Sequence, residues 1–215
     1  MVLRNNVERT SRVKETEKLI VKNNPVSVLE VGAGDYSFDY LLPKLNSNNR
    51  WYKLDFAPPC DFIIDLNVEN IKLPLEDKSY DMVIITEVLE HLLWPQSVLI
   101  ELYRVLKNGG TLIGSVPNIV SISYRIKWLF GGVPSCASCG NMPEKLNLTA
   151  YHDEEKIIGG HVIDFNKKKL KQLLDYASFS KVQFHRAGLF KGCQILPAYL
   201  TPVTIGSNLL FEAKK

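Results

Sequence analysis

Short apolar runs and helically spaced apolar residues follow one another along most of the chain. The runs predict strands over residues 26–31, 50–55, 61–65, 81–86, 111–116, 181–186 and 209–213. Helical spacing predicts helices over residues 6–22, 88–93 and 98–106, and a later one through residues 170–177 that Asn166 caps. This alternation is typical of an α/β protein with a doubly wound, mostly parallel sheet.

Breaker residues set the expected ends of these elements. Asn23-Asn24-Pro25 ends the first helix, and Pro95 breaks the helix over residues 88–93. The next helix is expected to end at Lys107-Asn108-Gly109-Gly110, where a cation in the last turn precedes two glycines.

Composition narrows the class of protein. The 215 residues contain no Gly/Ser-rich linker, which predicts one domain over residues 1–215. With 46% hydrophobic and 23% charged residues, a disordered chain is excluded. No apolar run reaches the length of a membrane span, and the first residues lack an apolar signal core. Four cysteines without a secretory signal favour reduced thiols and a cytoplasmic location.

Charge is distributed unevenly. Residues 1–118 hold 13 Lys/Arg and 16 Asp/Glu, whereas residues 119–195 hold 11 and 6. The net charge of +3 is too small to indicate a nucleic-acid partner. Lys167, Lys168, Lys169 and Lys171 are expected to form a solvated helix face, because no aromatic stacking platform accompanies them. The uneven charge indicates two roles within one domain.

The first candidate site is the turn after the first predicted strand. In doubly wound sheets, ligands bind at the carboxyl ends of the strands. Gly32 and Gly34 let backbone N–H groups approach a ligand, although a plain tight turn uses the same residues. Ser37 stands where a dinucleotide fingerprint has its third glycine. Glu30 would oppose a diphosphate and attract an ammonium group.

The next two turns supply carboxylates. Asp55 ends the second strand, at the distance from Gly34 expected of an acid that accepts both ribose hydroxyls. It is equally compatible with a turn-forming Asp before Ala-Pro-Pro. Phe56 could pack on an adenine ring, and Asp65 could accept from an exocyclic amine.

Taken in order, these motifs resemble class I S-adenosylmethionine-dependent methyltransferases. The resemblance is to the broad ubiquinone- and menaquinone-biosynthesis-type group (methyltransferase type 11). It runs from about residue 24 to residue 118 and continues more weakly to the end. The matching segments are Glu30-Val-Gly-Ala-Gly34, Tyr80-Asp-Met-Val83, Glu87-Val-Leu-Glu-His-Leu92, residues 104–118 and residues 160–174.

The resemblance implies a Rossmann-like sheet of seven strands whose last strand is antiparallel, and S-adenosyl-L-methionine as cofactor. Four kinds of contact follow from it or from the turns above. The methionine moiety would be held by Glu30, Gly32, Ala33 and Gly34, the ribose by Asp55, the adenine by Phe56, Asp65 and Leu66, and the sulfonium would lie beside Thr86 and Glu87. Many members have a glycine where Tyr36 stands, so Tyr36 is expected to narrow the cofactor mouth or line the acceptor wall.

His91 is the candidate general base. It follows Glu87 by four residues, so the two would share a helix face and could hydrogen-bond. The alternative is that His91 anchors the helix to the sheet edge. With one histidine in this motif, no zinc pair of the His-Glu-x-x-His type is present.

Cys136 and Cys139 form a single Cys-x-x-Cys. Two thiolates at that spacing can bind zinc, with His152 or His161 to complete the set. No second cysteine pair exists, so incidental thiols are favoured and no metal is predicted.

Residues 119–160 lie outside the matched segments and are expected to be a substrate-covering insertion. Residues 119–130 read as a helix packed on the sheet, as a lid with Tyr124 and Trp128 near the acceptor, or as a membrane-contacting helix. The lid is favoured, because the resembled family commonly places substrate-covering elements there.

The predicted function is methyl transfer from S-adenosylmethionine to an O or N centre of a small molecule, with anionic and partly lipophilic metabolites as candidates. A nicotinamide-dependent oxidoreductase is the first alternative, which Ser37 and Glu30 disfavour. A cofactor-binding interaction module without catalysis is the second.

Overall fold

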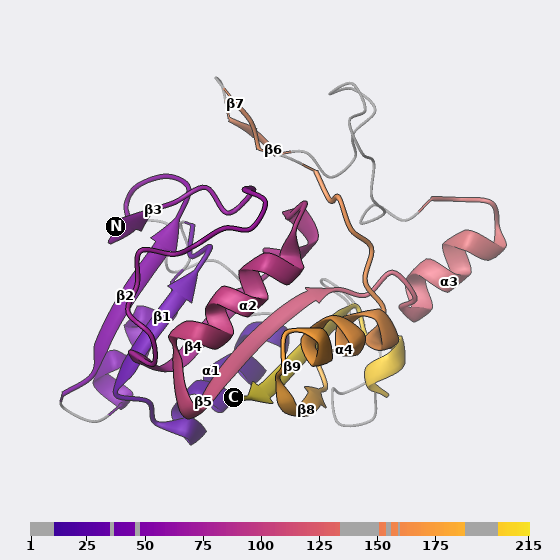
Figure 1. Cartoon of the computed structure of the whole chain (residues 1–215). Helices are drawn as coiled ribbons and strands as arrows, with labels where there is room; N and C mark the ends of the chain where they lie inside the picture. The colour runs from indigo at the N-terminus through magenta and orange to yellow at the C-terminus, as the bar shows by residue number, and fades with distance from the viewer. Residues whose placement is uncertain are drawn as a thin grey trace.

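A seven-stranded sheet runs through the molecule in the order β3-β2-β1-β4-β5-β9-β8 (Figure 1). The computed structural model describes residues 11–34, 37–45, 48–133, 151–153, 156–158, 160–187 and 202–215. The strands of the sheet are β1 (Ser27–Val31), β2 (Arg50–Asp55), β3 (Phe62–Ile63), β4 (Tyr80–Thr86), β5 (Leu106–Pro117), β8 (Ser180–His185) and β9 (Asn208–Lys214). Strands β1 to β5 pair in parallel, and β9 is antiparallel to β5 and to β8. The predicted α/β fold, with its antiparallel last strand, is confirmed.

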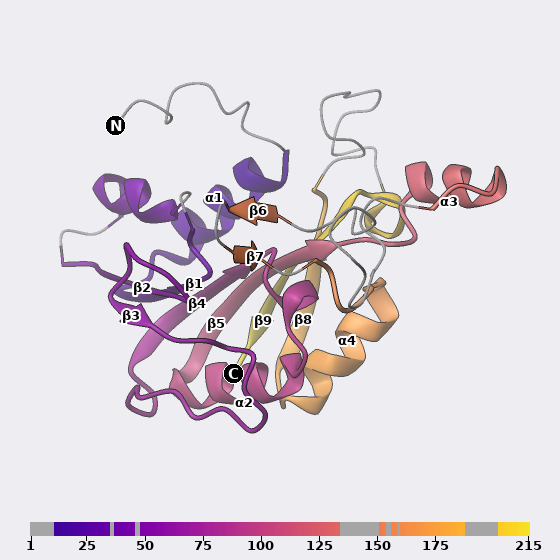
Figure 2. The ribbon, with the colours of Figure 1, turned by 90° about the horizontal axis from the view of Figure 1, so that it is seen from above.

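Helices cover both faces of the sheet (Figure 2). One face carries α1 (Ser11–Asn23) and the 3-10 segment η1 (Phe38–Lys44), and the other carries α2 (Pro95–Val105) and α4 (Lys167–Tyr176). Asn166 caps α4 as expected, because its side chain accepts a 2.9 Å hydrogen bond from the Lys169 N–H.

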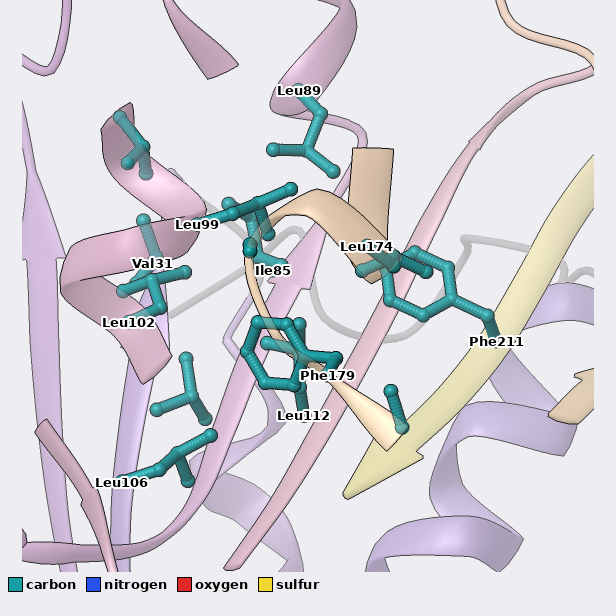
Figure 3. Packing of buried hydrophobic residues seen from close by; sticks show 14 of the residues in the cluster. Val31, Ile85, Leu89, Leu99, Leu102, Leu106, Leu112, Leu174, Phe179 and Phe211 are labelled. Carbon is teal, nitrogen blue, oxygen red and sulfur yellow. The ribbon is translucent and has the colours of Figure 1, made fainter. Parts of the chain in front are cut away.

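The core divides in two because successive residues of a strand point to opposite faces. In β4, Met82 and Ile84 pack with α1 and η1, whereas Val83 and Ile85 pack with α2 and α4. Figure 3 shows the second cluster, in which side chains from the sheet meet those of the two helices. The strands are thereby buried on both sides, and their carboxyl ends form one edge at which turns can hold a ligand.

The helix expected over residues 88–93 is wrong. The chain forms only a 3-10 turn there, η2 (Leu89–His91). Glu87 adopts a φ of +56°, which an α-helix cannot include, and Val88 is not helical either. Pro95 then begins α2 instead of merely ending a preceding helix.

The prediction that a helix ends at residues 107–110 is also wrong. Helix α2 ends at Val105, and Leu106 already pairs with Tyr80 as part of β5. Gly110 permits this path, because a Cβ there would lie 2.8 Å from the Lys107 carbonyl oxygen. The two glycines therefore serve an irregular strand entry, where the β4–β5 register shifts.

Parts of residues 119–160 form structure outside the main sheet. Helix α3 (Ile122–Leu129) has no buried residue, so the reading of a helix packed over the sheet is wrong. Figures 1 and 2 show α3 standing away from the sheet. Strands β6 (Tyr151–Asp153) and β7 (Lys156–Ile158) make a separate two-stranded pair. Cys136 and Cys139 lie outside the described residues. Within the described part of the chain, no helix is long and apolar enough to cross a membrane.

Candidate functional site

The glycine turn after β1 makes a close approach to the loop after β4. Gly32 and Gly34 adopt φ values of +69° and +47°. A Cβ on Gly32 would lie 2.2 Å from Val88 Cγ2, whereas one on Gly34 would meet no atom within 4 Å. Ala33 between them is buried. The turn is thus closed on the Val88 side and open at Gly34, where a ligand can approach the backbone.

Glu30 holds this turn in place through its own hydrogen bonds. It is buried, and its carboxylate accepts from Ser37 Oγ at 2.5 Å, Trp51 Nε1 at 2.7 Å and the Phe38 N–H at 3.0 Å. Burial raises the pKa of the Glu30 carboxyl, and these three donors offset part of the rise. Glu30 therefore connects β1 to the start of η1 and to β2.

Asp55 is tied directly to the glycine turn. Its Oδ2 accepts the Gly34 N–H at 2.8 Å, and its Oδ1 accepts the Phe56 N–H at 2.7 Å. A carboxylate offers about four lone-pair sites, so each oxygen can still accept from a ligand hydroxyl. The Phe56 side chain is 54% exposed, which leaves a ring face for a base to stack on.

The loop after β3 is bound to the loop after β4. Asp65 is exposed and accepts the Asn67 N–H at 2.8 Å, while Leu66 is buried. The Asn67 amide accepts from the Leu93 N–H at 2.8 Å and donates to the His91 carbonyl at 3.4 Å. The two turns expected to hold adenine and sulfonium are thus one connected unit.

Glu87, which follows Thr86 at the end of β4, is held by three other elements. Its carboxylate accepts from Ser115 Oγ at 2.8 Å and from Asn208 Nδ2 at 3.0 Å, and Arg12 Nε lies 3.9 Å away. Its backbone N–H donates to the Ser115 carbonyl at 2.8 Å. Strands β5 and β9 and helix α1 therefore fix the side chain beside the carboxyl edge.

His91 does not share an α-helical face with Glu87, so that prediction is wrong. The positive φ of Glu87 turns its side chain toward Ser115 and Asn208. The His91 ring instead packs edge-on against His161, with centroids 4.9 Å apart.

Glu90 lies beside these two imidazoles. Its side chain is buried, with 1% exposed, and burial together with the charge of Glu87 holds the pKa of its carboxyl well above 4.5. One ligand atom from each of Glu90, His91 and His161 lies within 4.8 Å of the others. Three groups that can hold protons or a cation therefore gather beside the loop after β4.

The expected acceptor residues are less close to this edge. Tyr36 lies outside the described residues. Tyr124 and Trp128 both lie on α3, where Trp128 is 50% exposed and Lys127 Nζ lies 5.8 Å above the Tyr124 ring. A cavity of about 790 Å³ lies at the opposite, amino edge of the sheet, beside Ser27 and Tyr80, and is not part of the site.

Several residues of the site were not predicted as such from the sequence. They act through long-range contacts with a predicted residue, and they are Arg12, Ser37, Trp51, Glu90, Ser115, His161 and Asn208. Glu90, Ser115 and His161 carried a usable signal, because all three stand in segments that match the resembled family.

Comparison with known proteins agrees with the motifs and the fold. Residues 29–114 match the methyltransferase domain family. A ubiquinone biosynthesis O-methyltransferase, mitochondrial, of Candida albicans is 24% identical over 213 residues, covering 92% of this chain and 59% of that protein. A probable S-adenosylmethionine-dependent methyltransferase of Mycolicibacterium smegmatis is 40% identical over 62 residues, which are 28% of this chain and 24% of that protein. The chain thus spans less than two thirds of the length of either curated relative.

The fold is shared with solved methyltransferases. The 1,6-didemethyltoxoflavin-N1-methyltransferase of Burkholderia thailandensis, solved with its substrate and S-adenosylhomocysteine, aligns with a TM-score of 0.57 and 16% identity, covering 97% of this chain and 79% of that one. Residues 29–114 therefore match a methyltransferase domain, and the chain as a whole shares the fold of solved methyltransferases.

Proposed function

We propose that the protein transfers the methyl group of S-adenosylmethionine to an O or N centre of a small-molecule acceptor. The observation that carries this proposal is the junction of Gly34 and Asp55. The open glycine turn and the ribose-binding candidate meet through a 2.8 Å hydrogen bond, at the edge that Glu87 also borders. S-adenosylmethionine is a nucleoside joined to an amino acid. Its ribose beside Asp55 and its amino-acid part beside Gly34 would then be neighbours along this edge.

The donors and acceptors at this edge of the sheet fit S-adenosylmethionine. Asp55 keeps lone pairs for two hydroxyls, Phe56 keeps an exposed ring face, and the backbone at Gly34 is open. We assign Asp65 and Leu66 to the adenine side and Thr86 to the sulfonium side. For Glu30 we propose an indirect role, because its carboxylate is already engaged by Ser37, Phe38 and Trp51.

The reaction needs little chemistry from the protein. A lone pair of the acceptor atom forms a bond to the methyl carbon while the carbon–sulfur bond breaks and sulfur keeps that electron pair. S-adenosylmethionine supplies an already activated methyl group, so the residues mainly orient the acceptor and exclude water. Such alignment contributes roughly 7–11 kcal/mol in favourable cases. A base is needed only where the acceptor atom carries a proton that must leave.

His91 is our candidate for that base. It packs against His161 and lies beside Glu90, so a proton taken by its imidazole would sit next to a carboxyl group. An anchoring role would leave turnover unchanged when acceptor is saturating. The turnover of a His91→Ala variant therefore distinguishes a base from an anchor.

We further propose that α3 covers the acceptor and that the acceptor is anionic. Beside α3 lies a hollow of about 530 Å³ lined by Arg125, Lys167, Lys168 and Lys171. Three lysines and an arginine around one hollow favour a negatively charged group. Contact of α3 with a membrane is the competing reading, and co-sedimentation with liposomes tests it.

Calorimetry on Asp55→Ala tests the function. Wild-type protein is expected to bind S-adenosylmethionine and S-adenosylhomocysteine but not NAD. Loss of hydrogen bonds to a charged acceptor costs about 1.5–3 kcal/mol, so Asp55→Ala should weaken S-adenosylhomocysteine by roughly 10- to 100-fold. The matched control is Asp175→Ala, which removes an exposed carboxylate on α4 and should bind as wild type does.

Two results would contradict the proposal. Binding of NAD alone would indicate an oxidoreductase. Binding of S-adenosylhomocysteine without methyl transfer to any acceptor in a broad panel of phenols, carboxylates and amines would indicate an interaction module.

A further inference from the structure

Glu90 is a buried acid that no hydrogen-bond donor satisfies. Its side chain is 1% exposed, and neither carboxylate oxygen has a hydrogen-bond partner among the described residues. Buried polar groups in folded proteins are almost always paired, and a buried charge is paired or bound to a metal. The unpaired oxygens of Glu90 are therefore available to a ligand, and a cation bound there would favour the ionised carboxylate.

Two imidazoles stand where such a partner could be held jointly. Ligand atoms of Glu90, His91 and His161 lie within 4.8 Å of one another. Both histidine rings are partly buried, and they meet edge-on at an interplanar angle of 67°. Two nitrogens and one carboxylate oxygen thus converge from one turn and one distant segment.

The backbone fixes this convergence. The Val162 and Ile163 N–H groups both donate to the Glu90 carbonyl, at 2.7 Å and 3.1 Å. These bonds attach the segment that carries His161 to the turn that carries Glu90 and His91. On the other side, Asn67 bonds to the His91 carbonyl and to the Leu93 N–H. Backbone hydrogen bonds therefore fix the segments that carry all three side chains.

We propose that Glu90, His91 and His161 bind a divalent cation of the zinc class. Two imidazoles with one carboxylate suit zinc and its neighbours in the transition series, whereas magnesium and calcium prefer oxygen ligands. Zinc bonds of about 2.0–2.2 Å place ligand atoms roughly 3–3.5 Å apart. The side chains therefore need only small rotations to close from their present spacing.

Such a set leaves coordination positions free, as catalytic three-ligand zinc sites do. If the proposed function is right, the cation would stand just after Thr86 and Glu87, on the side where the acceptor enters. A bound cation lowers the pKa of a hydroxyl that it coordinates. It would activate the acceptor in place of the base role proposed above for His91, because a metal-bound imidazole nitrogen cannot also take a proton. This part rests on the proposed function, and it narrows the acceptor to molecules that present a hydroxyl oxygen.

Metal binding itself is tested without turnover. Protein purified without chelators is titrated with Zn²⁺ against a chromophoric competitor, and with Co²⁺ for its absorption spectrum. We expect about one equivalent and no thiolate-to-cobalt charge-transfer band, because the ligands are nitrogen and oxygen. Glu90→Gln and His161→Ala should each weaken the affinity for Zn²⁺ by more than about 100-fold. Loss of an outer-shell partner alone lowers metal affinity by about 10- to 100-fold, and these residues are proposed as direct ligands. His185→Ala, which removes a histidine on β8, is the matched control and should bind as wild type does.

Thermal unfolding shows whether each variant is still folded. Without metal, Glu90→Gln should be at least as stable as wild type, because the neutral amide has the shape of the carboxyl group and never has to ionise in the interior. Added Zn²⁺ should raise the midpoint of wild type and of His185→Ala, but not that of Glu90→Gln.

Three outcomes would overturn the site. They are no Zn²⁺ binding, binding that Glu90→Gln leaves unchanged, or a thiolate band that points to Cys136 and Cys139. If Zn²⁺ fails to bind while S-adenosylhomocysteine binds and methyl transfer proceeds, this inference fails and the proposed function stands.

Discussion

Gly32 is a residue at which one added carbon has two separate effects. Its positive φ strains any L side chain, and a Cβ added at this position would collide with Val88. The sequence predicted that this glycine allows close backbone approach. It did not reveal that the nearest neighbour is the loop after β4, because that contact arises only when the two strands lie side by side.

We expect Gly32→Ala to lower the free energy of unfolding by about 1–3 kcal/mol and to weaken the affinity for S-adenosylhomocysteine at least about tenfold. The first effect is strain, and the second is displacement of the turn by Val88. Chemical denaturation and calorimetry measure the two.

Gly109→Ala serves as the control. Gly109 has a φ of +76°, and a Cβ there meets nothing within 4 Å. It should lose stability by about 1 kcal/mol from backbone strain and keep ligand affinity. Equal affinity losses in both variants would show that strain alone, and not the Val88 contact, controls the turn.

At the scale of elements, prediction succeeded where one face of a segment is buried. Strands β1, β2, β4 and β9 lie within a residue or two of their predicted ranges, because apolar runs between breakers leave few alternatives. It failed at η2 and at the start of β5, where Glu87 takes a left-handed φ and Leu106 pairs with Tyr80. Apolar spacing alone contains neither of these constraints.

The contact between β5 and β9 gives an element-scale prediction. A Cβ on Gly114 would lie 2.4 Å from Phe211 Cζ and 2.8 Å from the Ile85 carbonyl oxygen. Gly114→Ala should therefore destabilise the protein by about 1–3 kcal/mol through overpacking. Urea denaturation measures the loss.

Phe211→Leu supplies the partner for a double-mutant cycle. Because the smaller side chain frees space for the new methyl group, the double variant should lose less than the sum of the two single losses. The Ile85 carbonyl remains, so rescue should be partial. Strict additivity would mean that Phe211 is not what excludes a side chain at position 114.

For the molecule as a whole, the site was predicted in its parts and not in its connections. Asp55, Phe56 and Glu87 lie at the carboxyl edge, as the strand order requires. The partners Arg12, Ser115 and Asn208 come from segments far apart in sequence, so no local pattern could identify them. The cofactor roles of the predicted residues stay predictions until ligand binding is measured.

Glu30 contributes to the dependence of global stability on pH, in the same direction as Glu90, whose pKa is also raised. Its pKa in the folded protein is raised from 4.5, first by burial and further by Asp39, although Ser37, Phe38 and Trp51 lower it in part. The stability that Glu30 contributes is therefore fully present below pH 4.5 and is lost as pH rises through the raised value. Glu30→Gln should flatten the fall in unfolding free energy above pH 4.5.

Denaturation curves measured from pH 4 to pH 8 would check this slope. Glu76→Gln, which replaces an exposed acid, should retain the wild-type slope. A Glu30→Gln slope equal to that of wild type would place the raised pKa elsewhere.

Strand β9 follows every other described strand in the chain, yet it lies inside the sheet between β5 and β8. During synthesis on the ribosome, β5 and β8 must therefore wait as unpaired edges until residues 208–214 emerge. Asn208, which holds Glu87, arrives with them. The nascent chain thus gains a closed sheet and a finished carboxyl edge in one late event, and it is exposed to chaperones and to aggregation until that event occurs.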